Sequence, residues 1–313
     1  MQSYLINRYQ SVHLNNSKSN FLPCIYGVPQ VSVLGPLLFI IYVNDLPINI
    51  SGDASMAYMY ADDLALTVFN RQPNFLNKLT HTSSIIHEWC NANCLKLNYE
   101  KTVDLNIITC HRDLSVNTSI KFLGIYLEPT LGWSSHINYL AGKLRNSLFI
   151  LRVLKEYLNV EALMSVYYAH VYSHLSYAII LWGNHSTSSR LFVLQKKCVR
   201  LICGAQYRSH CKPLFVRLNV LTLPSMYVMD CLLYVKKNIL DLTTRASIHY
   251  YSTRNNSDIC LDKCKFSSTQ KSFDYMSKKL YNSIPLTIRN LPYFSFKKAI
   301  HGRLLKILFH QLK

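Results

Sequence analysis

The sequence contains no long apolar run. The longest, Leu37 to Val43, is far shorter than the roughly 20 residues that a helix needs to cross a bilayer. The opening residues, Met1-Gln2-Ser3-Tyr4, lack the pattern of a secretory signal peptide. We therefore expect an intracellular protein of the cytoplasm, the nucleus or both, with no signal peptide, no transmembrane segment and no membrane partner.

The cysteines lack the spacing of a zinc knuckle. Ten cysteines are scattered along 313 residues, and the pairs Cys90/Cys94 and Cys260/Cys264 are not matched by second pairs at metal-binding distance. A zinc site is the less favoured interpretation. Reduced and mostly buried thiols are the expected state of these side chains.

Acidic residues are scarce in the second part of the chain. Residues 1–132 hold 8 Lys/Arg and 9 Asp/Glu, whereas residues 133–313 hold 26 and 7, so the net charge of +18 comes entirely from the second part. A chain this basic favours a polyanionic partner. A solvated basic surface explains the charge equally well, and composition alone does not separate the two interpretations.

The hydrophobic pattern changes at about the same position. In the first part, an apolar run from Leu37 to Leu46 and the segment 74–93 have helical spacing, while short β-prone runs predict strands. These strands are expected at residues 55–60, 64–69, 94–97, 103–108 and 120–127. The first part is therefore predicted to be α+β.

The second part is predicted to be mostly helical. Long helix-patterned segments cover residues 137–158, 160–182 and 190–203, and Phe294 to Leu312 predicts a basic amphipathic helix. Residues 238–266 are rich in Ser, Thr and Asn and predict a loop or weakly ordered connector.

Two adjacent aspartates, Asp62 and Asp63, lie between the first two predicted strands. Tight hairpins prefer Asn-Gly or Asp-Gly, so a pair of like charges is an unusual choice for turn geometry alone. A hard divalent cation such as Mg²⁺ removes the repulsion, because it binds carboxylate oxygens and completes its shell with water and phosphates. Without further context, a polar turn remains the simpler interpretation.

The surrounding residues supply that context. The block from Gly27-Val28-Pro29-Gln30 to Phe39, followed by Tyr60-Ala61-Asp62-Asp63, closely resembles the reverse transcriptases of non-LTR retrotransposons, particularly the jockey-like group. Further blocks resemble the same family in the same order. They are Ile41 to Pro47, Leu97 to Thr102, and Lys121-Phe122-Leu123-Gly124-Ile125.

The resemblance implies a partial reverse transcriptase palm, an antiparallel sheet with packed helices, followed by a helical thumb. The expected divisions are a partial palm at residues 1–132, a basic thumb-like region at 133–237, and a connector with a basic C-terminal helical region at 238–313. The implied activity is RNA-directed DNA synthesis by two-metal nucleotidyl transfer, with Mg²⁺ or Mn²⁺ as cofactor. The implied partners are an RNA template, a DNA primer and deoxynucleotides.

The resemblance also assigns roles to residues. It implies that Asp62 and Asp63 are catalytic and bind the metal, that Pro29, Gln30 and Val31 face the template and nucleotide, and that Lys101 lies near the nucleotide phosphates. It implies a primer grip at Phe122, Leu123 and Gly124. Taken alone, a solvated surface lysine is the simpler interpretation of Lys101, and an ordinary core strand with a glycine bulge is the simpler interpretation of Phe122 to Gly124.

Two departures from the family pattern bear on activity. The family has a further catalytic aspartate upstream of Gly27, which this chain lacks, and a glycine where Val31 stands. A β-branched residue adds bulk there and does not readily take a positive φ. We therefore expect an N-terminally truncated copy that polymerises poorly or not at all by itself. The alternatives are a catalytically inactive nucleic-acid-binding remnant and a chain that barely folds.

Overall fold

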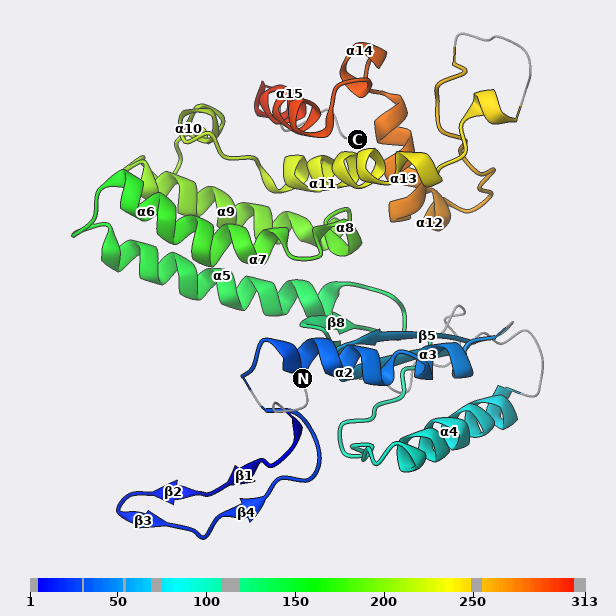
Figure 1. Cartoon of the computed structure of the whole chain (residues 1–313). Coiled ribbons are helices and arrows are strands. Elements are labelled where there is room, and N and C mark those ends of the chain that lie inside the picture. Colours follow the sequence, from blue (N-terminus) through cyan, green and yellow to red (C-terminus); the bar gives the residue numbers. More distant parts are fainter. Residues whose placement is uncertain are drawn as a thin grey trace. The chain divides into compact units, whose positions relative to one another are not determined.

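The chain forms two compact units, Met1–Val103 and Asp104–Lys313. The structure is a computed structural model that describes residues 5–29, 31–52, 55–68, 75–107, 119–248 and 255–306 (Figure 1). The regular elements of these residues are helices and small antiparallel strands, so the predicted α+β class is confirmed. No helix of the described part is long and apolar enough to cross a membrane.

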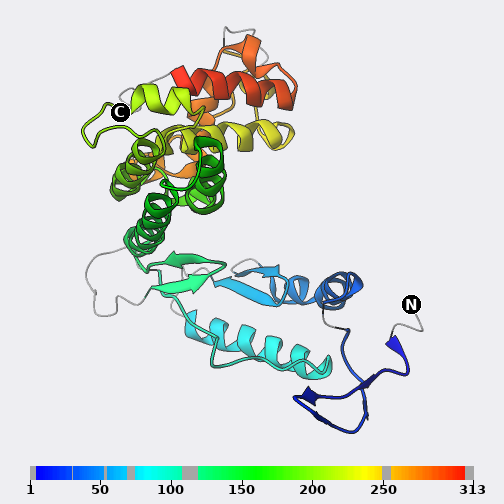
Figure 2. The same cartoon turned by 90° about the vertical axis from the view of Figure 1, so that its left-hand side faces the viewer.

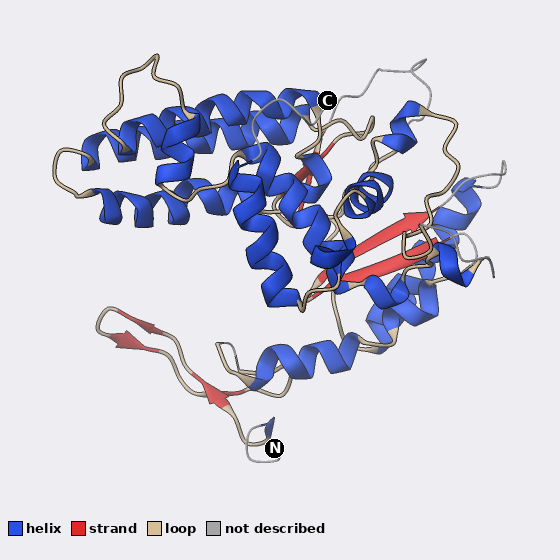
Figure 3. Cartoon of the chain, turned by 90° about the horizontal axis from the view of Figure 1, so that it is seen from above, coloured by secondary structure: helices blue, strands red, loops and turns tan. Residues whose placement is uncertain are grey.

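The first unit begins with a narrow ladder of very short strands. Strand β1 (Tyr9–Gln10) pairs with β4 (Leu22–Pro23), and β2 (His13–Leu14) pairs with β3 (Ser17–Lys18), both antiparallel. The ladder extends as a thin arm whose strand residues are all exposed (Figure 3). It therefore contributes no buried core to the unit.

The core of the first unit lies between a β-hairpin and helices. Helix α2 (Leu34–Val43) and helix α3 (Leu46–Ile50) precede strands β5 (Ser55–Tyr60) and β6 (Asp63–Val68), and helix α4 (Phe75–Ala92) lies along one face of the hairpin (Figure 2). The buried hydrophobic residues of this core are few in the described part of the unit. They are Leu46, Ile50, Ile86 and Cys90.

Two side-chain hydrogen bonds tie α2 and α3 to α4. The Tyr42 hydroxyl donates to the carbonyl oxygen of Asn93 at 2.7 Å, and Trp89 Nε1 donates to Asp45 Oδ2 at 3.1 Å. These bonds join residues about 50 positions apart and fix the helices that support the hairpin.

The strands predicted at residues 94–97 and 103–108 are wrong as far as the chain is described. Residues 94–107 form turns and irregular backbone, and Ile108 lies outside the described residues. Leu95 and Leu97 do pack against the small core, which accounts for their alternating apolar pattern. No described strand pairs with these residues, so the alternating pattern indicates packing against the core and not membership of a sheet.

The second unit begins with a hairpin and continues as helices. The predicted strand at residues 120–127 is two strands, β7 (Ile120–Phe122) and β8 (Ile125–Leu127), joined by a tight turn. The long helices that follow are α5 (Ser134–Leu154), α9 (Ser189–Ile202), α11 (Leu223–Lys237), α13 (Phe273–Asn282) and α15 (Tyr293–Lys306). Shorter helices connect them: α6 (Val160–Tyr167), α7 (Ser173–Ser176), α8 (Ile179–Trp182), α10 (Lys212–Arg217), α12 (Ser267–Gln270) and α14 (Leu286–Arg289).

The single helix predicted over residues 160–182 is wrong. The segment forms α6, a π-helical turn (Tyr168–Tyr172) and α7, and it then breaks before α8. Tyr177 is extended, with φ −63° and ψ 118°, and Ala178 has a left-handed φ of 50°. The apolar pattern persists across the break because Leu175 and Ile179 are both fully buried, which hides the break from the sequence.

A buried amide organises the core of the second unit. Gln195 on α9 is fully buried, and its Nε2 donates to the Tyr167 hydroxyl and to the Leu221 carbonyl, both at 3.0 Å. Its Oε1 accepts from the Leu223 amide at 2.8 Å. One side chain therefore joins α6, α9 and the start of α11.

The predicted connector at residues 238–266 is anchored in its described residues. Asp258 forms an ion pair with Arg289 at 3.0 Å, and both side chains are largely buried. The Asn282 amide bonds to both the N–H and the carbonyl of Ile259, each at 2.9 Å. The described residues of 238–266 form turns, short 3-10 segments and irregular backbone, as expected of the predicted loop, and these contacts anchor part of it.

The last predicted helix is present. Helix α15 buries Phe296 and Ile300 and exposes Lys297, Lys298, Arg303 and Lys306, as expected of a basic amphipathic helix. Residues 307–312 of that prediction lie outside the described residues.

Candidate functional site

The two aspartates lie at the tip of the β5–β6 hairpin, as predicted. The register runs from Ser55 opposite Val68 to Tyr60 opposite Asp63, which leaves Ala61 and Asp62 as a two-residue turn. Asp62 and Asp63 are both exposed. The hairpin therefore presents two adjacent carboxylates to solvent, beyond the end of its hydrophobic face.

Ala61 holds the turn in a strained conformation. Its φ is 54°, in the left-handed region that suits glycine, and a residue with a Cβ pays about 1–2 kcal/mol there. The rest of the hairpin compensates through six paired residues per strand and the core beneath it. Strain of this kind often occurs beside functional groups, and here it sits directly before the acidic pair.

The carboxylates of Asp62 and Asp63 provide only part of the ligand set that a hard cation needs. Carboxylate oxygens are the ligands that Mg²⁺ and Mn²⁺ prefer, and Mg²⁺ is commonly held by one or two carboxylates plus water and substrate phosphates. Asp62 and Asp63 meet that requirement chemically. Within the described ranges, no group of three or more His, Cys, Asp or Glu side chains could enclose a metal ion.

The loop before α2 contains the predicted nucleotide-facing residues. Pro29 is half-buried, and its carbonyl accepts a hydrogen bond from the Ser32 hydroxyl at 2.7 Å. Gln30 lies outside the described residues. Val31 is fully exposed and has a φ of 58°, so this valine adopts the conformation that a glycine would accept without strain.

Lys101 lies in a separate turn of the first unit. Its backbone amide bonds to the Asn98 carbonyl at 3.2 Å, and its side chain is exposed. Among the described residues, no acidic side chain forms an ion pair with it. The ammonium group is therefore available to solvent or to an anion.

Phe122, Leu123 and Gly124 form the end of the β7–β8 hairpin in the second unit. Phe122 pairs with Ile125, and the two turn residues have φ values of 46° at Leu123 and 80° at Gly124. Positive φ at both positions is the signature of a type I′ turn. The alternative of a core strand with a glycine bulge is therefore wrong.

The structure groups these residues by unit. Asp62 and Asp63 share a hairpin and Pro29 and Val31 share a loop, whereas Lys101 stands in its own turn and Phe122 to Gly124 belong to the helical unit. The sequence did not predict that the Tyr177 hydroxyl donates to the Leu123 carbonyl at 2.6 Å. No local motif marks this contact, because Tyr177 lies within an apolar run that predicts a continuous helix.

Few of the positive charges in the described residues of the second unit form ion pairs. In the described part of the chain the ion pairs are Lys278 with Asp274 at 2.7 Å and Arg289 with Asp258 at 3.0 Å. On α5, Lys143, Arg145 and Arg152 are exposed. This surface suits a polyanion.

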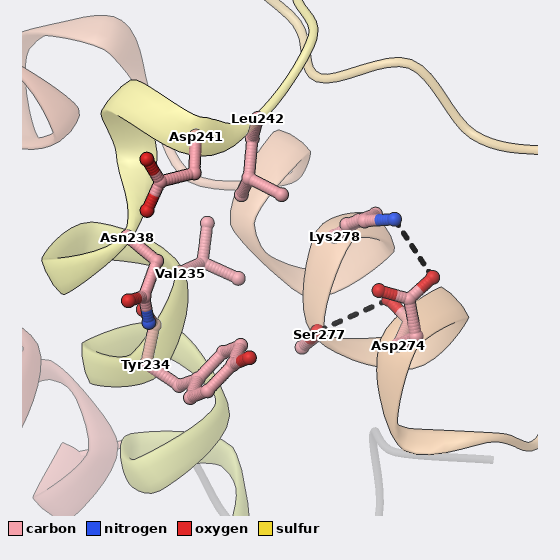
Figure 4. A pocket seen from close by; sticks show the side chains of 8 residues that line it. All are labelled: Tyr234, Val235, Asn238, Asp241, Leu242, Asp274, Ser277 and Lys278. Carbon is pink, nitrogen blue, oxygen red and sulfur yellow. Dashed lines mark hydrogen bonds and ion pairs between the residues drawn. The ribbon is translucent and has the colours of Figure 1, made fainter. Parts of the chain in front are cut away.

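A small pocket lies between α11 and α13, and none of the predicted site residues lines it. Its volume is about 140 Å³, and Figure 4 shows Tyr234, Asp241 and the Asp274–Lys278 ion pair around it. Its polar lining includes two carboxylates and one ammonium, so it is poorly suited to a nucleotide phosphate. We assign it no role in the candidate site.

Comparison with known proteins agrees with the motif blocks. Residues 1–127 match the family model described as reverse transcriptase (RNA-dependent DNA polymerase). The chain is 30% identical to a probable RNA-directed DNA polymerase from transposon BS of Drosophila melanogaster, and 25% identical to the RNA-directed DNA polymerase from mobile element jockey of the same species. Each match covers 66% of this chain and 25% of the relative.

A third relative belongs to another element. The chain is 25% identical to the retrovirus-related Pol polyprotein from type-1 retrotransposable element R1 of Bradysia coprophila, over 57% of this chain and 19% of the relative. The chain therefore spans about a quarter or less of the length of these curated relatives. No solved structure matches it.

Proposed function

We propose that the chain is a portion of an RNA-directed DNA polymerase. The premise is that residues 1–127 carry a reverse transcriptase domain and that the chain is related to jockey-like non-LTR elements. The observation that carries the proposal is the exposed Asp62-Asp63 pair at the tip of a regular hairpin within the matched residues. The substrates would be an RNA template, a DNA primer and deoxynucleotides.

We propose a palm and thumb architecture for the chain. The hairpins and α4 would belong to a partial palm at residues 1–132, and the basic helices to a thumb-like region at 133–237 followed by the C-terminal region. The β7–β8 hairpin belongs to the same compact unit as the helices, so we propose that it links the two regions. The boundaries at 132 and 237 stay predictions.

In this proposal Asp62 and Asp63 would hold Mg²⁺ or Mn²⁺. The cation, when bound, would activate the primer hydroxyl and stabilise the leaving pyrophosphate. Pro29, Gln30 and Val31 would face the template and nucleotide, Lys101 would attract the nucleotide phosphates, and Phe122 to Gly124 would orient the primer strand. Support comes from the exposure of both acids and of Lys101, for which the described residues show no ion pair.

A non-catalytic nucleic-acid-binding role is the second candidate. Two observations favour it for the chain alone: the described residues offer two adjacent carboxylates without a third ligand, and Val31 adds bulk beside the predicted nucleotide contact. Both roles require binding through the basic second unit. They differ in whether a primer is extended.

The decisive experiment is primer extension by the purified chain on an RNA template with Mg²⁺ or Mn²⁺. We expect extension by the wild-type chain to be no greater than that by Asp62→Asn, with Asp104→Asn as a matched exposed-acid control. Metal-dependent extension that Asp62→Asn abolishes would instead establish a complete polymerase site. Fluorescence anisotropy is expected to show primer–template binding that weakens at least about tenfold from 50 to 200 mM salt. Absence of both extension and binding would refute the proposed function.

A further inference from the structure

The turn at Leu123 and Gly124 is strained and needs support from outside the hairpin. Type I′ turns favour Asn or Gly at the first central position, whereas this turn has leucine there with φ 46°. A leucine in the left-handed region costs about 1–2 kcal/mol. With only three paired residues in each strand, the hairpin is too short to fix this geometry by its own ladder.

The base of the hairpin is held by helix α5. The Glu128 carboxylate accepts from the Ser135 amide at 2.5 Å, which satisfies a free N–H at the start of α5. The buried His136 ring lies beside β8, and its Nδ1 accepts from the Tyr126 amide at 3.5 Å. Burial lowers the pKa of His136, in keeping with a neutral ring that accepts at Nδ1. These contacts leave the tip of the hairpin unsupported.

Tyr177 provides the support at the tip. Its hydroxyl donates to the Leu123 carbonyl at 2.6 Å, and a Cβ added to Gly124 would lie 3.6 Å from Tyr177 Cε1, so the phenol ring lies against the glycine. The contact therefore engages both residues of the turn.

The backbone of Tyr177 is itself fixed by the break between α7 and α8. The buried Trp182 Nε1 donates to the Tyr177 carbonyl at 3.1 Å, and the Tyr177 amide donates to the Ser173 carbonyl at 3.2 Å. Ala178 then takes its left-handed φ. The irregular stretch of the chain thus positions one phenol ring, and π-helical turns such as Tyr168–Tyr172 frequently accompany functional sites.

We propose that Tyr177 is the positioning residue for the Phe122–Gly124 turn, and that it sets the affinity of the chain for a DNA primer annealed to an RNA template. The inference rests on the proposed function, because the ligand is the one named there. Tyr177 acts through the turn: its hydroxyl is engaged by the Leu123 carbonyl, and the turn presents Leu123 and Gly124 to the primer strand.

Tyr177→Phe tests the inference, because it removes only the hydroxyl. Tyr157→Phe is the matched control, since Tyr157 is 77% exposed and its hydroxyl forms no hydrogen bond with the described part of the chain. We expect Tyr177→Phe to lose amide-exchange protection at residues 122–125 and to bind the primer–template about three- to tenfold more weakly, the ratio for one lost hydrogen bond. Tyr157→Phe should change neither quantity.

Two results would overturn the inference. Unchanged exchange protection in Tyr177→Phe would show that the hydroxyl does not hold the turn, and lost protection with unchanged affinity would show a purely structural contact. Failure of the proposed function is distinguishable from both, because the wild-type chain would then show no salt-sensitive primer–template binding.

Discussion

Val31 occupies a backbone conformation that normally requires glycine. Its φ is 58° and its side chain is fully exposed, so a smaller residue would remove strain without loss of packing. We expect Val31→Gly to stabilise the loop before α2 by about 0.5–1 kcal/mol, after the entropy of the added glycine is subtracted. The free energy of opening of α2, measured by amide hydrogen exchange, reports the change.

Val31→Ala provides a graded comparison at the same position. Alanine keeps the Cβ but not the branch, so its opening free energy should fall between those of valine and glycine. Val12→Gly is the matched control, because Val12 is 69% exposed and has no positive φ. A stabilising effect of Val12→Gly as large as that of Val31→Gly would contradict an explanation based on the strain at residue 31.

For single residues, the sequence predicted backbone strain only where the family pattern has a glycine and this chain has another residue. That comparison predicted difficulty at Val31, and the observed φ agrees. Nothing in the sequence predicted left-handed φ at Ala61 or Leu123, because neither residue type favours that region. The two-residue turn that closes each hairpin imposes the left-handed φ. The length of that turn depends on the strand register.

At the scale of helices and strands, apolar periodicity predicted where an element lies better than whether a segment forms one unbroken helix. It correctly predicted α4, α5 and α9, whose buried residues recur at helical spacing, and the β5–β6 hairpin. It failed at residues 160–182, because the buried residues continue through the break at Tyr177 and Ala178. At that break, Trp182 Nε1 donates to the Tyr177 carbonyl, and the Tyr177 hydroxyl donates to the Leu123 carbonyl.

Gln195 offers a test of how the helices of the second unit are joined. Gln195→Leu would leave the Leu223 amide, the Leu221 carbonyl and the Tyr167 hydroxyl without their buried partner. We expect a loss of about 3–5 kcal/mol in the free energy of unfolding of this unit. Urea denaturation measures the loss.

Gln206→Leu is the control for this change, because Gln206 is exposed and lies only four residues after the end of α9. Its free energy of unfolding should stay within about 0.5 kcal/mol of wild type. Equal effects of the two leucine substitutions would show that the buried amide bonds of Gln195 do not hold α6, α9 and α11 together.

At the scale of the whole molecule, the two compact units differ in the size of their cores. Among the described residues, four hydrophobic residues are buried in the core of the first unit and none of them fully, whereas the larger core of the second unit includes the fully buried Tyr167, Trp182 and Phe296. We expect two urea transitions, with the first unit unfolding at the lower concentration because less apolar surface is buried there.

Tryptophan fluorescence assigns the transitions. Trp89 belongs to the first unit, and Trp133 and Trp182 belong to the second. Trp89→Phe should remove the fluorescence change at low urea and keep the later one. A single transition that coincides for fluorescence and circular dichroism would show that the chain unfolds as one cooperative whole.

Contacts between distant parts of the chain were the least predictable from the sequence. The α+β class followed from local patterns, and two β-prone runs correctly predicted that both acids lie at the tip of one hairpin. The contact of Tyr177 with Leu123 spans 54 residues, and the bonds of Gln195 span 26 to 28. Contacts of that separation depend on how helices pack, which no periodicity within one segment records.

The left-handed Ala61 limits how the acidic hairpin can change by mutation. Among residues that one nucleotide substitution can produce from an alanine codon, valine and threonine branch at Cβ, and proline fixes φ near −65°. Glycine alone among them would accept the turn freely. In a gene copy that drifts without selection, a single common mutation at residue 61 would therefore distort the tip of the β5–β6 hairpin. Both carboxylates would still be present in the sequence.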